Sequence, residues 1–129
     1  MVFFTLQIKG VYVMNIVIQD KILALTKQKL QNKDVDICRK IHSMGGGIEE
    51  KIWTINQKIK FIFRTEEYGK KILSLVISMN GGETKQNFND KEFANNMHNL
   101  FVERERQQFQ DFQDEKQKMF LDDFQAKMK

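Results

Sequence analysis

The stretch Ile41–Lys60 reads IHSMGGGIEEKIWTINQKIK, and the interpretation of the whole chain starts from it. Three consecutive glycines, Gly45, Gly46 and Gly47, follow a segment of alternating residues. Beyond them isoleucines recur at positions 48, 52, 55 and 59, which is the spacing of one apolar stripe on an α-helix. We therefore predict a strand, then a glycine turn, then a helix over Ile48–Lys60.

This junction is a candidate anion site. The first N–H groups of a helix have no intrahelical partner and lie at the positive end of the helix dipole, so they bind phosphate readily. Glycines leave the backbone free of side chains at that point. The alternative is that Gly45–Gly47 only permit a tight turn with positive φ, a common role of glycine.

The composition indicates a globular domain with an appendage. Of the 129 residues, 41% are hydrophobic and 29% are charged, which is enough to form a core. The single cysteine, Cys38, leaves no intramolecular disulfide and fits an intracellular, reducing compartment. No apolar run reaches the roughly 18 residues of a membrane span, and Met1–Ile18 lacks a signal-peptide pattern. We expect no contact with a membrane.

Positive charge is concentrated in the first part of the chain. Residues 1–82 carry 13 Lys and Arg against 7 Asp and Glu (13 − 7 = +6), whereas residues 83–129 carry 8 against 10 (8 − 10 = −2). We predict two units that meet at this point. A basic first unit fits a polyanionic partner such as nucleic acid.

The other segments of residues 1–82 complete an α+β pattern. The expected strands are Val2–Ile8, Val11–Ile18, Val35–Ile41, Phe61–Arg64 and Ile72–Met79, and Glu66–Gly69 is expected as a hairpin loop. A first helix is expected from an N-cap at Asp20 to about Asn32. After the leading strand, the predicted order is strand, helix, strand, helix, strand, strand. The segment from Gly81 to Asn87 has the composition of a linker.

The C-terminal part is predicted to be one long helix, or two in succession. Asn89 and Glu92 are spaced as in a capping box, and the chain contains no proline that would interrupt a helix. One interpretation is a solvated helix packed on its own domain, and the other is a docking helix. The candidate partner-binding residues are Phe93, Met97, Phe101, Phe109, Phe112, Phe120 and Phe124.

No arrangement typical of an enzyme active site is present. His42 and His98 are far apart and have no third ligand at metal-binding spacing. Cys38 and His42 fall on one side of a predicted strand, but no third group orients them as a nucleophile and base. The glycines lack the Gly-Lys-Ser/Thr ending of a P-loop. We predict no catalytic residue, no metal site and no cofactor.

The order of elements, with a glycine turn before the second helix, resembles the Alba superfamily of small nucleic-acid-binding proteins. The strand at Val11–Val13, the KQKL sequence at Lys27–Leu30 and the motif Ile41–Gly45 are similar to the smaller Alba-type subunit of eukaryotic ribonuclease P and ribonuclease MRP. This similarity covers roughly Val11–Met79. It implies an Alba-like β-α-β-α-β-β sheet with two helices in residues 1–82, plus an added N-terminal strand and a long helical extension over residues 83–129.

The resemblance also implies a function, that of a noncatalytic subunit which binds structured noncoding RNA in a ribonucleoprotein that processes tRNA or rRNA. It implies a heterodimer with a second Alba-like chain, other ribonucleoprotein proteins on the C-terminal helix, and a nuclear or nucleolar location. The candidate RNA contacts are Lys21, Arg39, Lys40, His42, Ser43, Gly45, Gly46, Gly47, Arg64, Lys70 and Lys71. The chain departs from the family pattern in a lysine-poor first loop and in Glu66 and Glu67 of the hairpin.

Two other functions stay open at this point. The first is a protein-interaction module in a larger assembly, in which a small pleckstrin-homology-like or signal-recognition-particle-like sheet carries a C-terminal docking helix. In that case Phe93–Phe101 pack on the sheet. The second is a general Alba-type chromatin or messenger-RNA binder that acts as a homodimer.

Overall fold

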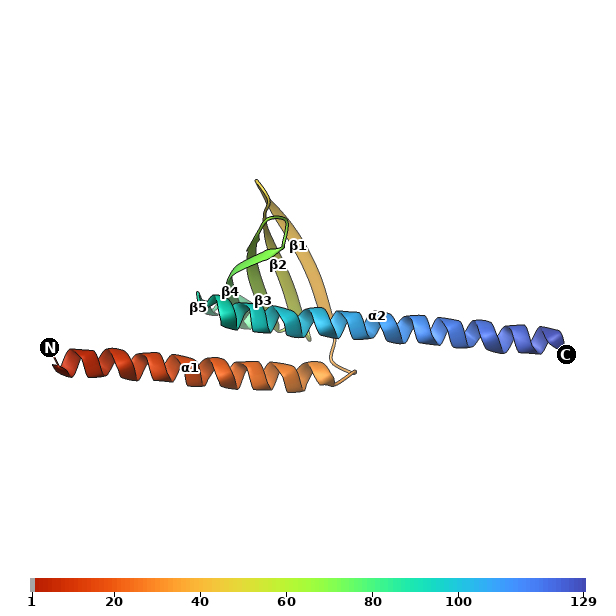
Figure 1. Cartoon of the computed structure of the whole chain (residues 1–129), viewed down its shortest axis with the longest axis horizontal. Coiled ribbons are helices and arrows are strands. Elements are labelled where there is room, and N and C mark those ends of the chain that lie inside the picture. Colours follow the sequence, from red (N-terminus) through yellow and green to blue (C-terminus); the bar gives the residue numbers. More distant parts are fainter. Residues whose placement is uncertain (1) are drawn as a thin grey trace.

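The chain is an α+β protein in which two helices lie beside a five-stranded antiparallel sheet (Figure 1). The computed structural model describes the backbone of residues 2–129 and the side chains from residue 16 onward. The elements are α1 (Val2–Gln31), β1 (Ile37–Gly45), β2 (Ile48–Ile55), β3 (Ile59–Glu66), β4 (Lys71–Met79), the 3-10 turn η1 (Asn80–Gly82), β5 (Thr84–Phe88) and α2 (Lys91–Met128). The α+β class and the long C-terminal helix are confirmed, as are strands at Phe61–Arg64 and Ile72–Met79.

The N-terminal segment is helical, so two predicted strands are wrong. Val2–Ile8 and Val11–Ile18 both belong to α1, although their β-branched and aromatic residues favour strands. Nothing in this segment forces a break, because an interior glycine such as Gly10 costs a helix only about 1 kcal/mol. The helix ends at Gln31, within one residue of the predicted end. Asp20 lies inside the helix and is not an N-cap.

The predicted helix Ile48–Lys60 is also wrong, because this segment forms β2, a turn and the start of β3. Asn56 and Gln57 have φ values of 51° and 61°, as in the hairpin turns that match sheet twist. The isoleucines at 48 and 52 lie on one face of the sheet, and those at 55 and 59 lie on the other. Their spacing of four, three and four imitates a helical stripe, but the underlying period is two.

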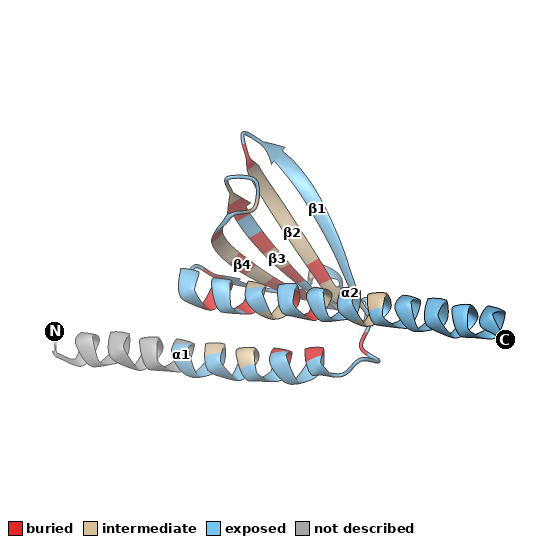
Figure 2. Ribbon diagram, turned by 45° about the vertical axis from the view of Figure 1, so that its right-hand side comes forward, coloured by how far each residue is buried: buried red, intermediate tan, exposed pale blue. Residues whose placement is uncertain are grey.

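The sheet is a simple meander in which β1, β2, β3, β4 and β5 are neighbours in chain order. Trp53 on β2 pairs with Phe61 on β3, which pairs with Ile77 on β4, and all three are buried. We call this the covered face, because α2 packs on it and α1 packs beside α2 (Figure 2). The opposite side is called the open face.

The first turns of α2 complete the core on the covered face. Phe93, Met97 and Phe101 are buried against the sheet. The rings of Phe101 and Trp53 stack with centroids 5.1 Å apart. The expectation that Phe93–Phe101 pack on a sheet is therefore confirmed.

The segment predicted as a linker is structured. Asn80–Gly82 forms η1, and Thr84–Phe88 forms β5, which pairs with β4. Phe88 is buried, and its ring lies 5.0 Å from that of Phe93. The core thus contains residues from both sides of the boundary predicted at residue 82.

The N-cap of helix α2 lies one residue later than predicted. Asp90, rather than Asn89, is the N-cap, and its Oδ1 accepts hydrogen bonds from the N–H groups of Glu92 and Phe93 at 3.0 and 3.2 Å. Such a cap satisfies helix donors that have no intrahelical partner. The helix then runs for 38 residues, and its C-terminal half continues past the sheet (Figure 1).

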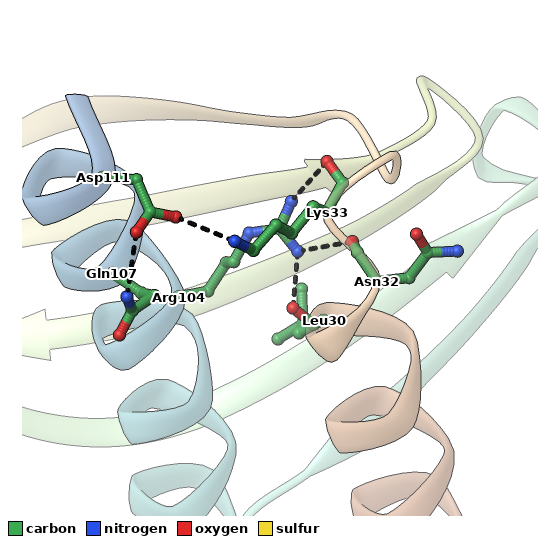
Figure 3. A network of polar contacts seen from close by, with 6 residues as sticks. All are labelled: Leu30, Asn32, Lys33, Arg104, Gln107 and Asp111. Atoms are coloured by element: carbon green, nitrogen blue, oxygen red, sulfur yellow. Dashed lines mark hydrogen bonds and ion pairs between the residues drawn. The ribbon is translucent and has the colours of Figure 1, made fainter. Parts of the chain in front are cut away.

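Arg104 of α2 holds the end of α1 in place (Figure 3). Its Nη1 donates to the carbonyl oxygens of Leu30 at 2.5 Å and Asn32 at 3.0 Å. Its Nη2 donates to those of Val35 at 2.8 Å and Lys33 at 3.5 Å. The last carbonyls of a helix lack intrahelical donors. One buried guanidinium therefore caps α1 and fixes the connection to β1.

Candidate nucleic-acid interface

The three glycines form a hairpin turn and not the start of a helix. Gly45 is the last residue of β1, and Gly46 and Gly47 form the turn to β2; their φ values are 85°, 62° and 79°. The carbonyl oxygen of Gly47 accepts a hydrogen bond from the N–H of Tyr68 at 2.9 Å, which joins this turn to the β3–β4 turn. Because Ile48 begins a strand, the helix N-terminus and dipole predicted for a phosphate are absent from this turn.

The register of the sheet decides which charged residues share a surface. Residues directly opposite each other on neighbouring strands point to the same face, and successive residues alternate. His42 of β1 pairs with Glu50 of β2, which pairs with Arg64 of β3. The next row on this face begins with Lys40, which pairs with Ile52. All of these lie on the open face.

A third row crosses all five strands of the open face. It runs from Cys38 through Thr54, Lys60 and Ser78 to Lys85. Lys60 and Lys85 are exposed. Neither was predicted as a site residue, because Lys60 was assigned to the end of a helix and Lys85 to a linker. In a strand, residues separated by an even number of positions lie on one face. Had the segment been assigned as a strand, this rule would have placed Lys60 on the same face as Arg64.

The open face has an excess of positive charge. Its Lys and Arg residues are Lys40, Lys60, Arg64, Lys71 and Lys85, and its carboxylates are Glu50 and Glu66 (5 − 2 = +3). All five basic residues are exposed. Ile52, Ile62 and Val76 lie between them and are partly buried. The face thus combines a short aliphatic centre with cations around it.

The predicted RNA contacts are divided among several parts of the molecule. Lys40, His42, Arg64 and Lys71 share the open face. Arg39 points to the covered face, where its Nη1 lies 3.3 Å from Oε2 of Glu105. The remaining predicted contacts are Lys21 on α1, Ser43 and Gly45 in the last part of β1, Gly46 and Gly47 in the first hairpin turn, and Lys70 in the β3–β4 turn.

His98 of α2 lies against the covered face, and its pKa is lowered strongly. Its ring packs edge-on against Trp53 and Phe63, with centroids 5.3 and 5.4 Å away. Its Nε2 lies 3.4 Å from Nζ of Lys51. Burial first, and the positive charge of Lys51 second, lower the pKa of His98 from 6.5 to about 4. His98 is therefore neutral at physiological pH, and its partly buried ring packs against the core residues Trp53 and Phe63.

The predicted partner-binding residues fall into two groups. Phe93, Met97 and Phe101 are buried in the core. The other four, Phe109, Phe112, Phe120 and Phe124, are exposed on the part of α2 that extends past the sheet (Figure 2). We call residues 109–128 the distal segment. Only this segment presents predicted partner-binding side chains to solvent.

Comparison of the chain with family models, with curated proteins and with solved structures finds no match. No helix among the described residues combines the length and the apolar character needed to cross a membrane. In the same part of the chain, no three His, Cys, Asp or Glu side chains are grouped as metal ligands.

Proposed function

We propose that this chain is a noncatalytic protein that binds the phosphate backbone of structured RNA through the open face. One observation carries the proposal: the sheet register gathers five exposed Lys and Arg residues on the one face that the helices leave free. Phosphate neutralisation by such residues supplies most sequence-independent binding to nucleic acid.

The shape of the face suits backbone contacts better than base recognition. Neighbouring strands lie about 4.8 Å apart, so Lys40 on β1, Lys60 on β3 and Lys85 on β5 are spread over roughly 20 Å. Lysine side chains are flexible point charges that contact phosphates without reading sequence. His42 is the one aromatic side chain that β1–β5 place on this face, so stacking on bases is limited to a single ring at its edge. Specificity would then come from the shape of the RNA and from other proteins.

A place in a ribonuclease P or ribonuclease MRP type of particle, with a second Alba-like chain, remains a prediction. The strand–helix–strand–helix order that suggested it differs from the order found, because Ile48–Ile55 is a strand and Val2–Gln31 is a helix. What supports RNA binding is the charge on the open face, and it does not depend on membership of that family.

The test compares two charge reversals of equal size. The double variant Lys60→Glu/Lys85→Glu alters the open face, and the control Lys27→Glu/Lys91→Glu alters exposed lysines on the two helices. With transfer RNA as the probe at low salt, we expect the first variant to weaken binding by about tenfold or more and the control to change it much less. Equal losses in the two variants, or no binding by the unmodified chain, would overturn the proposal.

A protein-interaction role is the second candidate, and the exposed phenylalanines of the distal segment favour it. In that case alanine at Phe109, Phe112 and Phe120 abolishes binding to a protein partner, whereas changes at Lys70 and Lys71 have no effect. Capture of partners from the native source with each variant separates this role from RNA binding.

A further inference from the structure

The turn η1 joins β4 to β5 and contains the dipeptide Asn80–Gly81. Asn80 is the one asparagine in the sequence that a glycine follows. Such a pair is reactive, because the backbone nitrogen of the second residue can attack the asparagine side chain when no Cβ stands in its way. This turn therefore carries a pair of groups that can react with each other.

The reacting groups of this turn are open to solvent. Asn80 and Gly81 are exposed. A Cβ built on Gly81 would meet nothing within 4 Å, so the space around the attacking nitrogen is free. The side-chain amide of Asn80 is weakly held, because its hydrogen bond from Nδ2 to Oγ1 of Thr84 is 3.5 Å long. Water therefore has access to both the amide carbon and the backbone nitrogen.

The backbone of the turn allows the rotation that ring closure requires. The φ values of Asn80, Gly81 and Gly82 are 55°, 67° and 98°. Asparagine is one of the few residues besides glycine that adopt such values readily, and a glycine that follows adapts to rotation of the peptide group before it. The rotation breaks one hydrogen bond of 3.3 Å, from the N–H of Glu83 to the carbonyl oxygen of Asn80. The nitrogen of Gly81 can then face the side-chain carbon.

We propose that Asn80 is a site of spontaneous deamidation, which places a carboxylate beside Lys85 of the open face. The backbone nitrogen of Gly81 loses its proton and forms a bond to Cγ of Asn80. The bond from Cγ to Nδ2 breaks, and ammonia leaves with a proton taken from water. Water then opens the succinimide ring at either carbonyl carbon. Opening at Cγ gives aspartate, and opening at the backbone carbonyl carbon gives isoaspartate.

The new charge lies at the edge of the surface proposed for RNA. A Cβ built on Gly82 would lie 3.5 Å from Cε of Lys85, so the Lys85 side chain runs along this turn. Either product is ionised at neutral pH and lowers the net charge of the chain from +4 to +3 (4 − 1 = 3). A carboxylate beside Lys85 offsets a positive charge that would otherwise neutralise a phosphate. This consequence rests on the proposed function, whereas the chemical step does not.

Mass spectrometry of the full chain, kept for several days at mildly alkaline pH, tests the chemical step. The peptide that contains Asn80 should gain the mass difference between a hydroxyl and an amino group and should separate into two products. Asn56 is the control within the same molecule, because it is exposed and has a φ of 51° but is followed by Gln57. Its Oδ1 also accepts a hydrogen bond from the N–H of Asp36 at 3.0 Å. Asn56 should keep its amide.

The variant Asn80→Gln should abolish the conversion at this position, because the longer side chain would have to close a larger ring. Gln57 has a φ of 61°, so this sheet already accommodates glutamine in a turn of the same hand. An unchanged Asn80 after the incubation, or equal conversion of Asn56 and Asn80, would overturn the inference.

Binding to transfer RNA at low salt tests the consequence for the open face. The deamidated chain should bind about threefold or more weakly than Asn80→Gln kept under the same conditions. Equal affinities would contradict an effect of the new carboxylate on the open face. Absence of binding by both proteins would overturn the proposed function, while the mass measurement decides separately whether Asn80 deamidates.

Discussion

Arg104 and Val35 are joined by a hydrogen bond of 2.8 Å from the guanidinium Nη2 to the carbonyl oxygen. Arg104 is 7% exposed and belongs to α2, whereas Val35 belongs to the connection between α1 and β1. The same guanidinium donates to Leu30 and Asn32. The cation is buried and bonded to carbonyl oxygens at the C-terminal end of a helix, where the helix dipole favours positive charge.

Replacing Arg104 by Lys should therefore destabilise the protein. An ammonium group is a point donor that cannot reproduce the planar fork, and carbonyl oxygens would be left unpaired in the core. We expect the free energy of unfolding in urea to fall by about 2 kcal/mol or more. Arg106→Lys is the control, because Arg106 is exposed and pairs only with nearby Glu103 among the described residues. Equal effects of the two substitutions would contradict the role of Arg104.

The stability of the folded protein should depend strongly on the side chain of Phe101. Its ring stacks on Trp53 and is fully buried, so Phe101→Ala should lower the free energy of unfolding by about 3–5 kcal/mol. Val102→Ala, at the next and exposed position, should change it by less than about 1 kcal/mol. Chemical denaturation of both variants measures the difference. A small effect at Phe101 would mean that α2 does not pack on the sheet as described.

Stability should fall in mild acid because of His98. Its pKa is about 4 in the folded protein and 6.5 when unperturbed, so below pH 6.5 the unfolded chain binds a proton that the folded chain does not. The free energy of unfolding therefore falls progressively as the pH is lowered from 6.5 to about 4. His98→Gln should flatten the pH dependence of the melting temperature over this range. The control His42→Gln should keep this pH dependence. If His42→Gln flattens it and His98→Gln does not, the assignment to His98 is wrong.

For the substitution Gly46→Asp, the hairpin turn that is found and the helix start that the sequence predicts lead to opposite expectations for RNA binding. With Ile48–Lys60 as a helix, Gly46→Asp would block an anion site and weaken RNA binding severely. In the hairpin found, a Cβ at Gly46 meets open space, and its φ of 62° is the left-handed region that Asp tolerates. We expect a stability loss of about 1–2 kcal/mol and nearly unchanged affinity for transfer RNA at matched salt. A large loss of affinity would restore the phosphate site to this turn.

Parts of the fold that depend on local signals could be predicted from the sequence. The strands Phe61–Arg64 and Ile72–Met79 and the long C-terminal helix have clear periodicity and clear breaks. The segment Ile48–Ile59 could not be assigned correctly, because isoleucines on both faces of a sheet reproduced a helical spacing. Val2–Ile18 was missed for a related reason, since strand propensity outweighed the absence of a break. The first case depends on tertiary context, because only strand pairing decides which face of the sheet each isoleucine occupies.

The candidate site was predicted in part. Lys40, His42, Arg64 and Lys71 were predicted as RNA contacts through the Alba resemblance, and they do share one face of the sheet. Lys60 and Lys85 could not be found, because only the strand register places them beside the others. A surface made of single residues from five strands leaves no continuous motif in the sequence.

Lysine footprinting tests the central claim most directly. The unmodified full chain is acylated with and without bound transfer RNA, and the labelling of each lysine is read by mass spectrometry. RNA bound to the open face should protect Lys40, Lys60 and Lys85 and leave Lys27 and Lys91 on the helices reactive. Protection of the helix lysines in place of these three, or no protection at all, would contradict the account.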